Sequence, residues 1–509
     1  MLKRFTSNVA GASVFIAFFG ILTKGLGFLR EVIFASIFGL STEFDIYLVA
    51  AVLPLTINMI MMTIGQNYLI PAYNNFKQIE SSKAINFIQS NLVLFFFAGL
   101  FLSAIFYSFS NQLLSIFIQH SDLVIKQTAV DIFNLFLITI PITCGISVIS
   151  AYQQGNFEFR FSILSQIIPN IVVILALFAL KDLNVYAIPI GYVAGTILQF
   201  LFMIITSKEL IILEKEYLLS FGNLINSLSL SVIVVILIES VGHLYLIADR
   251  FFYEWVEPGG VSSLSYAQTL FLLPVSIISI ALSTAIFPKF SKLFSNKDYN
   301  GLEKIFNDGL SFTIIFFVPV MFIFLFYGDV IIKILFERGK FSSDDTIITF
   351  SVLSYLALSI IFYAAYGILN KFLYSSGMIN QLLLITTLGI ALKISLNFYF
   401  VSNMQQDGLA LSTSLSFLFF FIASITAIHK KKFFISRTSF LSEFIFHLFN
   451  GVLSLLIIKQ ISVLYPENTF FALIEMCLFL LIFITNLFLL KFSSTRIILD
   501  FISTFKRYN

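Results

Sequence analysis

Stretches of about 20 apolar residues, each long enough to cross the hydrocarbon core of a bilayer as a helix, recur along the whole chain. Charged side chains make up 11% of its 509 residues, against roughly 25% in an ordinary soluble domain. Hydrophobic residues make up 59% of the chain, and 64 residues are Phe. This composition excludes a water-soluble fold and predicts an all-α polytopic membrane protein.

The apolar stretches predict fourteen transmembrane helices. The first follows Lys3 and Arg4, and we interpret it as a helix rather than a signal peptide because no small-residue cleavage site follows it. The loops are short and contain no glycine-rich phosphate loop, so the sequence offers no soluble catalytic or nucleotide-binding domain. The predicted spans are residues 10–36, 44–66, 86–109, 128–151, 161–180, 185–206, 225–249, 263–287, 309–328, 347–370, 380–401, 407–428, 441–462 and 469–490.

The distribution of Lys and Arg predicts the orientation of these helices. An even number of spans puts both termini on one side, and 20 of the 30 Lys and Arg fall on that side, with 6 opposite and 4 within spans. Positive loops stay in the cytoplasm, so both termini are expected there. The net charge of +3 gives no reason to expect nucleic acid, and four His and two Cys cannot supply a zinc cluster, so no metal site is expected.

An internal repeat organises the chain. Pro54 and Pro274 each follow a Leu within a span, and Gly155 and Gly377 each follow a Tyr-x-x, at offsets of 220 and 222 residues. We interpret this as a duplicated six-helix unit in parallel orientation, an arrangement that commonly gives alternating access. The alternative is that such motifs recur by chance at helix ends in membrane proteins. The predicted domains are an N-terminal lobe (1–224), a C-terminal lobe (225–440) and an appended helix pair with a cytoplasmic tail (441–509).

The first span carries charges at membrane depth. Lys24, Arg30 and Glu31 lie in it, beside Gly25 and Gly27, which weaken the helix. Charged residues inside a membrane are functional candidates, because burying them is costly unless they are paired or line a watery cavity. The alternative is a local ion pair between Arg30 and Glu31, with Lys24 extending to the interface.

Asp45 and two prolines are further candidates. Asp45, at the start of the second span, can reach the cationic cluster and orient it, or it can cap a helix. Pro54 and Pro274 are either hinges of a rocking motion or fixed kinks that shape the cavity.

A second group of polar residues suggests ion coupling. Glu239 and Asp249 lie in the seventh span, and Lys393 and Asn397 lie one turn apart in the eleventh. A contact between Glu239 and Lys393 would be either a satisfied ion pair or a site for a coupling ion or proton. No cofactor is expected, and the candidate energy sources are the membrane potential, Na⁺ and H⁺.

Several segments make the chain resemble the MurJ/MviN family of lipid-linked glycan flippases, in the multidrug/oligosaccharidyl-lipid/polysaccharide exporter superfamily. They are Lys24–Phe38, Asp45 with Pro54, Gly260–Ala267, Pro288–Lys292 and Leu335–Thr346. The resemblance implies fourteen helices in two lobes of a bacterial cytoplasmic (inner) membrane protein. It also implies a cationic cavity that translocates lipid II, the undecaprenyl-diphosphate-linked precursor of peptidoglycan, together with membrane lipids and cell-envelope synthesis machinery as partners. The family's cavity positions match Lys24, Arg30, Glu31 and Asp45, which would bind the substrate.

Two positions depart from the family pattern. Asn58 and Thr269 stand where members serving peptidoglycan synthesis usually have Arg, and neither offers a bidentate fork to a diphosphate. A flippase for another lipid-linked oligosaccharide, such as a surface-polysaccharide or O-antigen unit, is therefore an alternative. A cation-coupled drug exporter is a second alternative, but Lys24 and Arg30 favour an anionic cargo. A membrane-embedded glycan polymerase is a third, yet no large outer loop or acid–base cluster is visible, so a transporter rather than an enzyme is expected.

Overall fold

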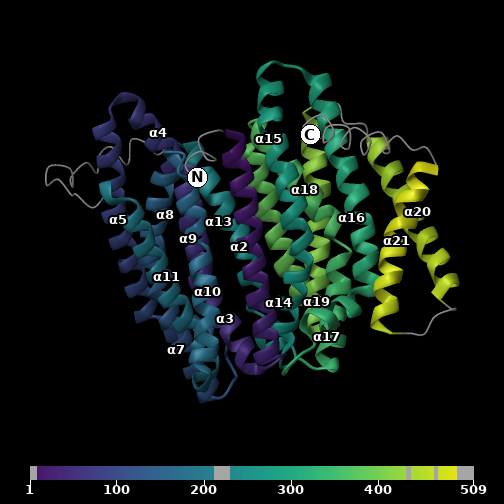
Figure 1. Cartoon of the computed structure of the whole chain (residues 1–509), viewed down its shortest axis with the longest axis horizontal. Helices are drawn as coiled ribbons and strands as arrows, with labels where there is room; N and C mark the ends of the chain where they lie inside the picture. The colour runs from purple at the N-terminus through teal and green to yellow at the C-terminus, as the bar shows by residue number, and fades with distance from the viewer. Residues whose placement is uncertain (1–8, 211–229, 432–436, 463–467, 490–509) are drawn as a thin grey trace. The chain divides into compact units, whose positions relative to one another are not determined.

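The computed structural model describes the chain except for residues 1–8, 211–229, 432–436, 463–467 and 490–509 (Figure 1). The side chains of some helical residues, Glu239 among them, also lie outside the description. The described residues form helices and their connections, in two compact units, Met1–Ser262 (unit 1) and Ser263–Asn509 (unit 2). The all-α fold expected from the sequence is confirmed.

Unit 1 is built from long apolar helices and short connecting turns. Within it α10 packs against α11, α5 against α8, and α3 against α7, α8 and α13. Its α-helices are α2 (Val9–Phe38), α3 (Thr42–Ile64), α4 (Ile70–Ile79), α5 (Ser81–Ser108), α6 (Ser110–Ser115), α7 (Leu123–Leu137), α8 (Thr139–Gly155), α9 (Phe159–Ser165), α10 (Ile167–Ala179), α11 (Ala187–Thr206) and α13 (Leu230–Arg250). Its other helical turns are the π-helix η1 (Gly65–Leu69) and the 3₁₀ turns η2 (Lys181–Tyr186), η3 (Lys208–Leu210) and η5 (Tyr253–Trp255).

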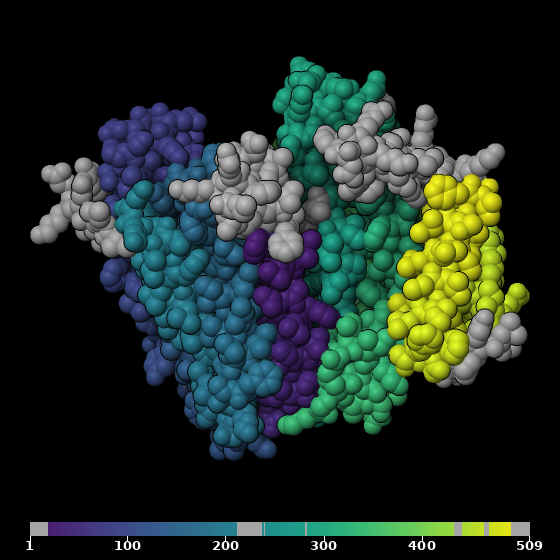
Figure 2. Space-filling view, in the orientation of Figure 1, coloured from purple at the N-terminus to yellow at the C-terminus, as the bar shows by residue number. Residues whose placement is uncertain are grey.

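Unit 2 repeats this plan and adds a helix pair. Its helices are α14 (Gly260–Pro274, whose first residues belong to unit 1), the π-helix η6 (Val275–Ser279), α15 (Ile280–Ser295), α16 (Tyr299–Phe336), α17 (Ser343–Ala357), α18 (Ile360–Ser375), α19 (Ile379–Lys430), α20 (Arg437–Ser462) and α21 (Thr469–Leu489). The last two pack against each other and against α16. In Figure 2 they form the yellow edge of unit 2, where Phe470, Leu481 and Leu489 of α21 are exposed, as expected of a helix that faces lipid.

The helix boundaries support the repeat. Residues 123–137 (α7) and 343–357 (α17) are helices of equal length displaced by 220 residues. Each copy also has one helix break with the same backbone conformation, at Asn184 (φ 48°) and Gln405 (φ 49°). The predicted match of Gly155 with Gly377 is two residues out of register, because the residue with the left-handed conformation of Gly377 (φ 72°) is Phe157 (φ 59°).

The number of membrane-spanning helices stays a prediction. Among the described residues, 10 helices are long and apolar enough to cross a membrane, or 11 if α17 and α18, which meet at 46°, form one broken span. Every predicted span overlaps a described helix, and α19 contains two of them because its backbone breaks at Gln405.

The division into compact units differs from the predicted domains. The predicted lobes meet at residues 224 and 225, whereas the units meet at Ser262 and Ser263. The reason is that α13 packs on α3 and η1, so it belongs by contact to unit 1 although it begins the second copy of the repeat. The appended helices α20 and α21 belong to unit 2.

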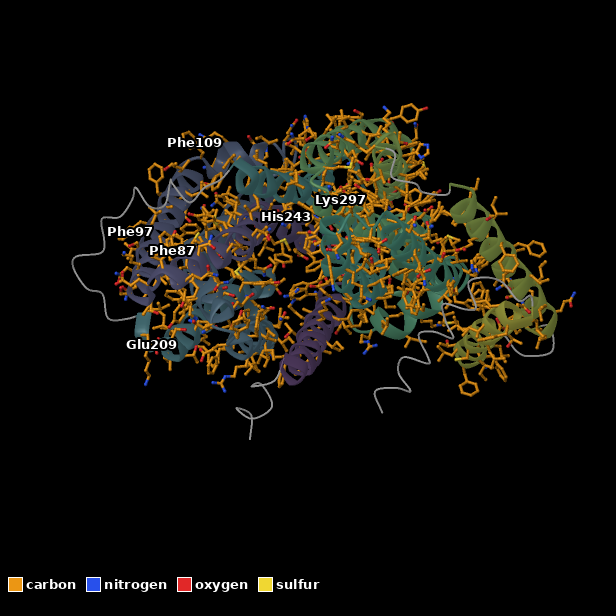
Figure 3. All side chains as sticks on the ribbon, turned by 90° about the horizontal axis from the view of Figure 1, so that it is seen from above. Phe87, Phe97, Phe109, Glu209, His243 and Lys297 are labelled. Carbon is orange, nitrogen blue, oxygen red and sulfur yellow. The ribbon has the colours of Figure 1, made fainter. Side chains whose placement is uncertain are left out.

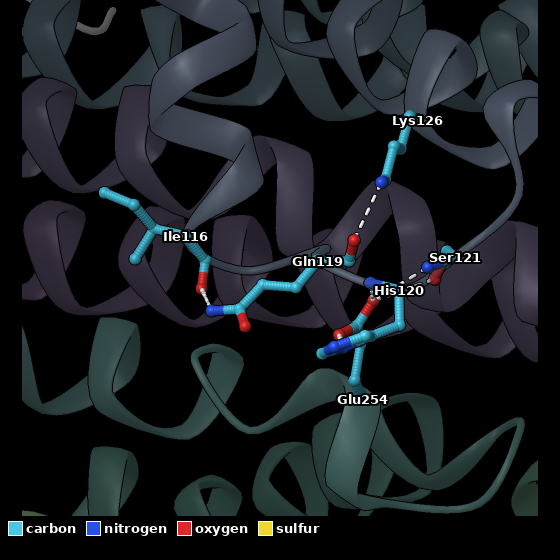
Figure 4. Close-up of polar contacts among 6 residues, drawn as sticks. All are labelled: Ile116, Gln119, His120, Ser121, Lys126 and Glu254. Carbon is cyan, nitrogen blue, oxygen red and sulfur yellow. Dashed lines mark hydrogen bonds and ion pairs between the residues drawn. The ribbon is translucent and has the colours of Figure 1, made fainter.

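A carboxylate ties the connection after α13 to the loop between α6 and α7 (Figure 4). Glu254 accepts hydrogen bonds from the backbone N–H groups of His120 (2.6 Å) and Ser121 (3.0 Å) and from the Ser121 hydroxyl (3.1 Å). The His120 ring Nδ1 lies 3.0 Å from its other oxygen. This clasp fixes the course of the chain on one side of unit 1.

Candidate functional site

Arg30 forms the centre of a polar cluster in unit 1. Its Nη2 donates to Glu31 Oε1 at 2.6 Å, and its Nη1 donates to Asn170 Oδ1 on α10 at 3.0 Å. The side chains of Arg30 and Glu31 are 18% and 16% exposed. The structure therefore brings together the two adjacent residues that the sequence singled out, and it adds Asn170, which the sequence gave no reason to select.

Aromatic rings surround the guanidinium. Its Cζ lies 5.5 Å from the centroid of Phe34 and 5.3 Å from that of Tyr192. Tyr192 contacts Phe136, which in turn contacts Tyr47, at centroid distances of 5.3 and 6.0 Å. Rings stabilise a cation through their faces, and they exclude water, which strengthens the attraction of the cation for an anion.

Arg30 keeps one donor unused. Its Nε has no hydrogen-bond partner among the residues that the structure describes, although the atom is buried. A planar guanidinium offers parallel donors to a carboxylate or phosphate. With Glu31 on Nη2 and Asn170 on Nη1, the cluster holds Arg30 in a fixed orientation while leaving this further donor for an anion.

Lys24 is not part of this cluster. It is exposed on α2, and six residues of helix separate it from Arg30, which corresponds to about 9 Å along the axis and about 120° around it. Gly25 has open space around it, and a Cβ on Gly27 would meet only Asn170 Oδ1 at 3.8 Å. Packing therefore does not require either glycine, and their role as a hinge stays a prediction.

Asp45 makes contacts other than those expected. Its carboxylate is fully buried and accepts the backbone N–H of Gly259 at 2.7 Å, the backbone N–H of Ser262 at 2.6 Å, and the Ser262 hydroxyl. These groups form the N-terminus of α14, where an anion is favoured by the helix dipole. Of the two alternatives, the structure shows capping, and of a helix distant in sequence; the cap of its own helix is Ser41. The expected orientation of the Arg30 cluster by Asp45 is replaced by this contact.

A second buried arginine lies near Asp45. Arg250, at the end of α13, is 6% exposed, interacts electrostatically with Asp45, and has an Nη1 without a hydrogen-bond partner among the described residues. The adjacent Asp249 is 1% exposed. Arg250 is a site residue that the sequence did not single out, although its position at the end of an apolar helix was a usable signal.

The proline-containing helices are both followed by π-helical turns. Pro54 is buried within α3, which leads into η1, and Pro274 ends α14, which leads into η6. π-helical insertions frequently occur at functional sites. Whether Pro54 and Pro274 act as hinges or as fixed kinks stays a prediction.

Both departures from the family pattern have local partners. Asn58 Nδ2 donates to Thr139 Oγ1 at 2.8 Å, and Thr269 Oγ1 donates to the Ser265 carbonyl of its own helix at 3.0 Å. Each side chain therefore has a structural role in its unit.

The proposed ion-coupling residues fall in two places. Lys393 and Asn397 are fully buried in α19, and Lys393 Nζ donates to Thr413 Oγ1 at 3.0 Å. The side chain of Glu239 lies outside the described residues, so its contact with Lys393 stays a prediction. In the described part of the chain, no three His, Cys, Asp or Glu side chains are grouped to hold a metal ion.

A separate cavity of about 540 Å³ lies where α4, α8 and α11 end. Tyr73 and Lys77 both donate to Asn156 Oδ1, at 3.0 and 2.5 Å, and Tyr152 donates to Glu209 at 2.6 Å. Figure 3 shows Glu209 at the periphery of unit 1. Because these polar groups satisfy one another, the cavity gives no indication of a particular ligand.

Comparison with known proteins agrees with this architecture. A family model described as "Lipid II flippase MurJ" matches residues 34–484. A probable lipid II flippase MurJ of Rickettsia prowazekii is 24% identical over 419 residues, covering 80% of this chain and 81% of the relative. The lipid II flippase MurJ of Thermosipho africanus is 25% identical over 484 residues, covering 94% and 96%.

Two solved structures share the fold. Lipid II flippase MurJ in an inward closed conformation matches with a TM-score of 0.80 at 21% identity, covering 93% of this chain and 97% of that one. An inward-facing multidrug transporter of the MATE family, in the MOP superfamily, matches with a TM-score of 0.66 at 12% identity, covering 82% and 95%. Because the family model extends over most of the sequence, the chain belongs to the MurJ family of lipid II flippases.

Proposed function

We propose that this chain is a flippase that moves an undecaprenyl-diphosphate-linked saccharide, lipid II, across the cytoplasmic membrane of a bacterium. The observation that carries the proposal is the buried Arg30 guanidinium, which is held by Glu31 and Asn170 and keeps an unused Nε donor. The names of the relatives support lipid II as the cargo.

The cluster suits a transient anion better than a permanent one. Glu31 neutralises Arg30 at 2.6 Å, which offsets the cost of placing a cation in the membrane when no cargo is bound. A diphosphate carries more charge than a carboxylate and can use the Nε edge, so it competes with Glu31 for the guanidinium. Departure of the diphosphate restores the Arg30–Glu31 pair, so the cargo is not trapped. No covalent step is part of this mechanism.

Further features of the proposal follow from the family and the sequence. Transport proceeds by alternating access from the inner to the outer leaflet, with both termini in the cytoplasm. The undecaprenyl tail stays in the lipid, and cell-envelope synthesis enzymes supply and consume the cargo. The membrane potential, Na⁺ or H⁺ drives the cycle.

A flippase for another lipid-linked oligosaccharide is the second candidate. It is favoured by Asn58 and Thr269, since neither can provide the bidentate contact of an arginine. The fold is shared with a multidrug transporter, but a buried cation in the cluster disfavours a cationic drug as cargo.

The test uses cells in which this chain is the only lipid II flippase, with a leaflet-accessibility assay for lipid II. Arg30→Lys is expected to impair transport although it keeps the charge, and Arg30→Ala is expected to abolish it, both at normal membrane abundance. Arg338→Ala, at an exposed position, is the matched control and is expected to transport normally. Full transport by Arg30→Ala would eliminate the proposed anion site, and transport of a different lipid-linked glycan only would establish the second candidate.

A further inference from the structure

The appended helix α20 buries a polar face. Glu443, His447, Asn450 and Ser454 follow one another at intervals of four, three and four residues, which places them on one side of a helix. The last three are fully buried, whereas Leu441, Ile445 and Phe449 on the opposite side are exposed. The polar side therefore faces protein and the apolar side faces outward.

This face packs closely against its neighbours. Gly451 lies within it, and a Cβ there would approach the Phe322 ring of α16 to 2.4 Å, so the two helices meet at a distance that only glycine permits. On the other side, Asn450 Nδ2 donates to the Phe483 carbonyl of α21 at 3.0 Å, and its Oδ1 accepts from Asn486 at 3.0 Å. Asn450 is thus explained as a link between helices.

His447 is not explained in this way. The residue is fully buried, and neither ring nitrogen has a hydrogen-bond partner in the described part of the chain. Its ring contacts Phe446 and Phe483, at centroid distances of 5.5 and 6.1 Å. An unpartnered polar group in such surroundings is destabilising, and an apolar ring of similar size would pack at lower cost. Packing alone therefore gives no reason for an imidazole at this position.

Acidic groups lie along the same interface. Glu443, one turn before His447 on α20, accepts a hydrogen bond from the Ser311 hydroxyl of α16. Glu475 of α21 accepts from the Tyr327 hydroxyl of α16 at 3.2 Å. The other titratable side chains described on this pair, Lys459 and Cys477, are exposed. Acid and imidazole chains inside membranes commonly carry protons.

We propose that His447 and Glu443 form a proton-binding site and that proton uptake there drives transport. The proton comes from water at the membrane surface and binds one ring nitrogen of His447, giving an imidazolium. The Glu443 carboxylate one turn away stabilises this cation, and the proton later returns to water, restoring the neutral ring. Because Glu443 also bonds Ser311, the protonation state of the site is linked to the contact between α20 and α16. This inference rests on the proposed function, of which it names the driving ion.

The transport test uses the full chain in proteoliposomes containing lipid II, with and without an imposed pH gradient. The gradient is expected to raise the wild-type flipping rate about tenfold or more. His447→Phe is expected to fold with an unchanged or higher midpoint of thermal unfolding and to lose this response. His429→Phe, at an exposed histidine near the end of α19, is the matched control and is expected to respond like wild type. A wild type insensitive to the gradient, or a His447→Phe variant that responds fully, would overturn the proposal.

A second measurement separates this inference from the proposed function. In protein labelled with ¹⁵N at histidine, the ring signals missing from His447→Phe are expected to titrate, and Glu443→Gln is expected to move their midpoint to lower pH. A His447 signal that does not titrate between about pH 4 and 9 would refute proton binding. Absence of lipid II flipping under all conditions, with a titrating His447, would instead count against lipid II as the cargo.

Discussion

Asp45→Ala is expected to destabilise the protein through α14 and not through the Arg30 cluster. The Asp45 carboxylate accepts two backbone N–H groups and one hydroxyl at the N-terminus of α14, and it is fully buried. The Ser262 hydroxyl can turn to another acceptor, but the two N–H groups of Gly259 and Ser262 have fixed directions. Gly259 cannot relax easily, since it has φ +87° and a Cβ there would lie 2.6 Å from the Leu40 carbonyl.

The magnitude follows from these two donors. Each buried donor left without a partner costs about 1–3 kcal/mol, so Asp45→Ala should lower the free energy of unfolding by about 3–4 kcal/mol. For a unit of this size, that corresponds to a fall of about 6–15 °C in the midpoint of thermal unfolding. Asp45→Asn keeps one carbonyl acceptor and should cost about half as much.

The assay is thermal unfolding of the purified protein in detergent, measured together with lipid II flipping in cells. Glu43→Ala is the matched control, since Glu43 lies in the same first turn of α3 but is exposed. An unfolding midpoint of Asp45→Ala equal to that of Glu43→Ala would refute the capping role. Loss of flipping by Asp45→Asn at an unchanged midpoint would instead support the role expected from the sequence, orientation of the cations.

Three further outcomes are expected. Burial raises the pKa of Glu254, but the hydrogen bonds from the α6–α7 loop outweigh this effect and hold its pKa below the ordinary 4.5. The clasp therefore stabilises the protein above that value and weakens as the pH falls through the lower pKa of the folded state; protease cleavage of the loop should rise with acid in wild type and become independent of pH in Glu254→Gln. A reporter fused after Lys432 should stay in the cytoplasm and one fused after Lys340 should be exported, and the opposite result would refute the orientation. Gly451→Val should lower the unfolding midpoint, with a cost of about 1–3 kcal/mol from overpacking against Phe322, and an unchanged midpoint would contradict the close approach of α20 and α16.

The sequence determined the class of protein, the course of its helices and the duplicated plan. These features depend on local properties, since the length of an apolar run is set by the thickness of the bilayer. Duplication left a register that is visible in Pro54 and Pro274. The pair of Arg30 and Glu31 was also accessible, because adjacent charges within an apolar helix must find partners or a function.

The tertiary structure decided which side chains meet across long separations. Asn170 reaches Arg30 across 140 residues, and Asp45 caps a helix that begins more than 200 residues later. Likewise, His447 differs from the other histidines only because α16 and α21 cover it and provide no partner for its nitrogens among the described residues. Partners of this kind are selected by the packing of whole helices, and the energies of single polar contacts are too small to leave a pattern along the chain.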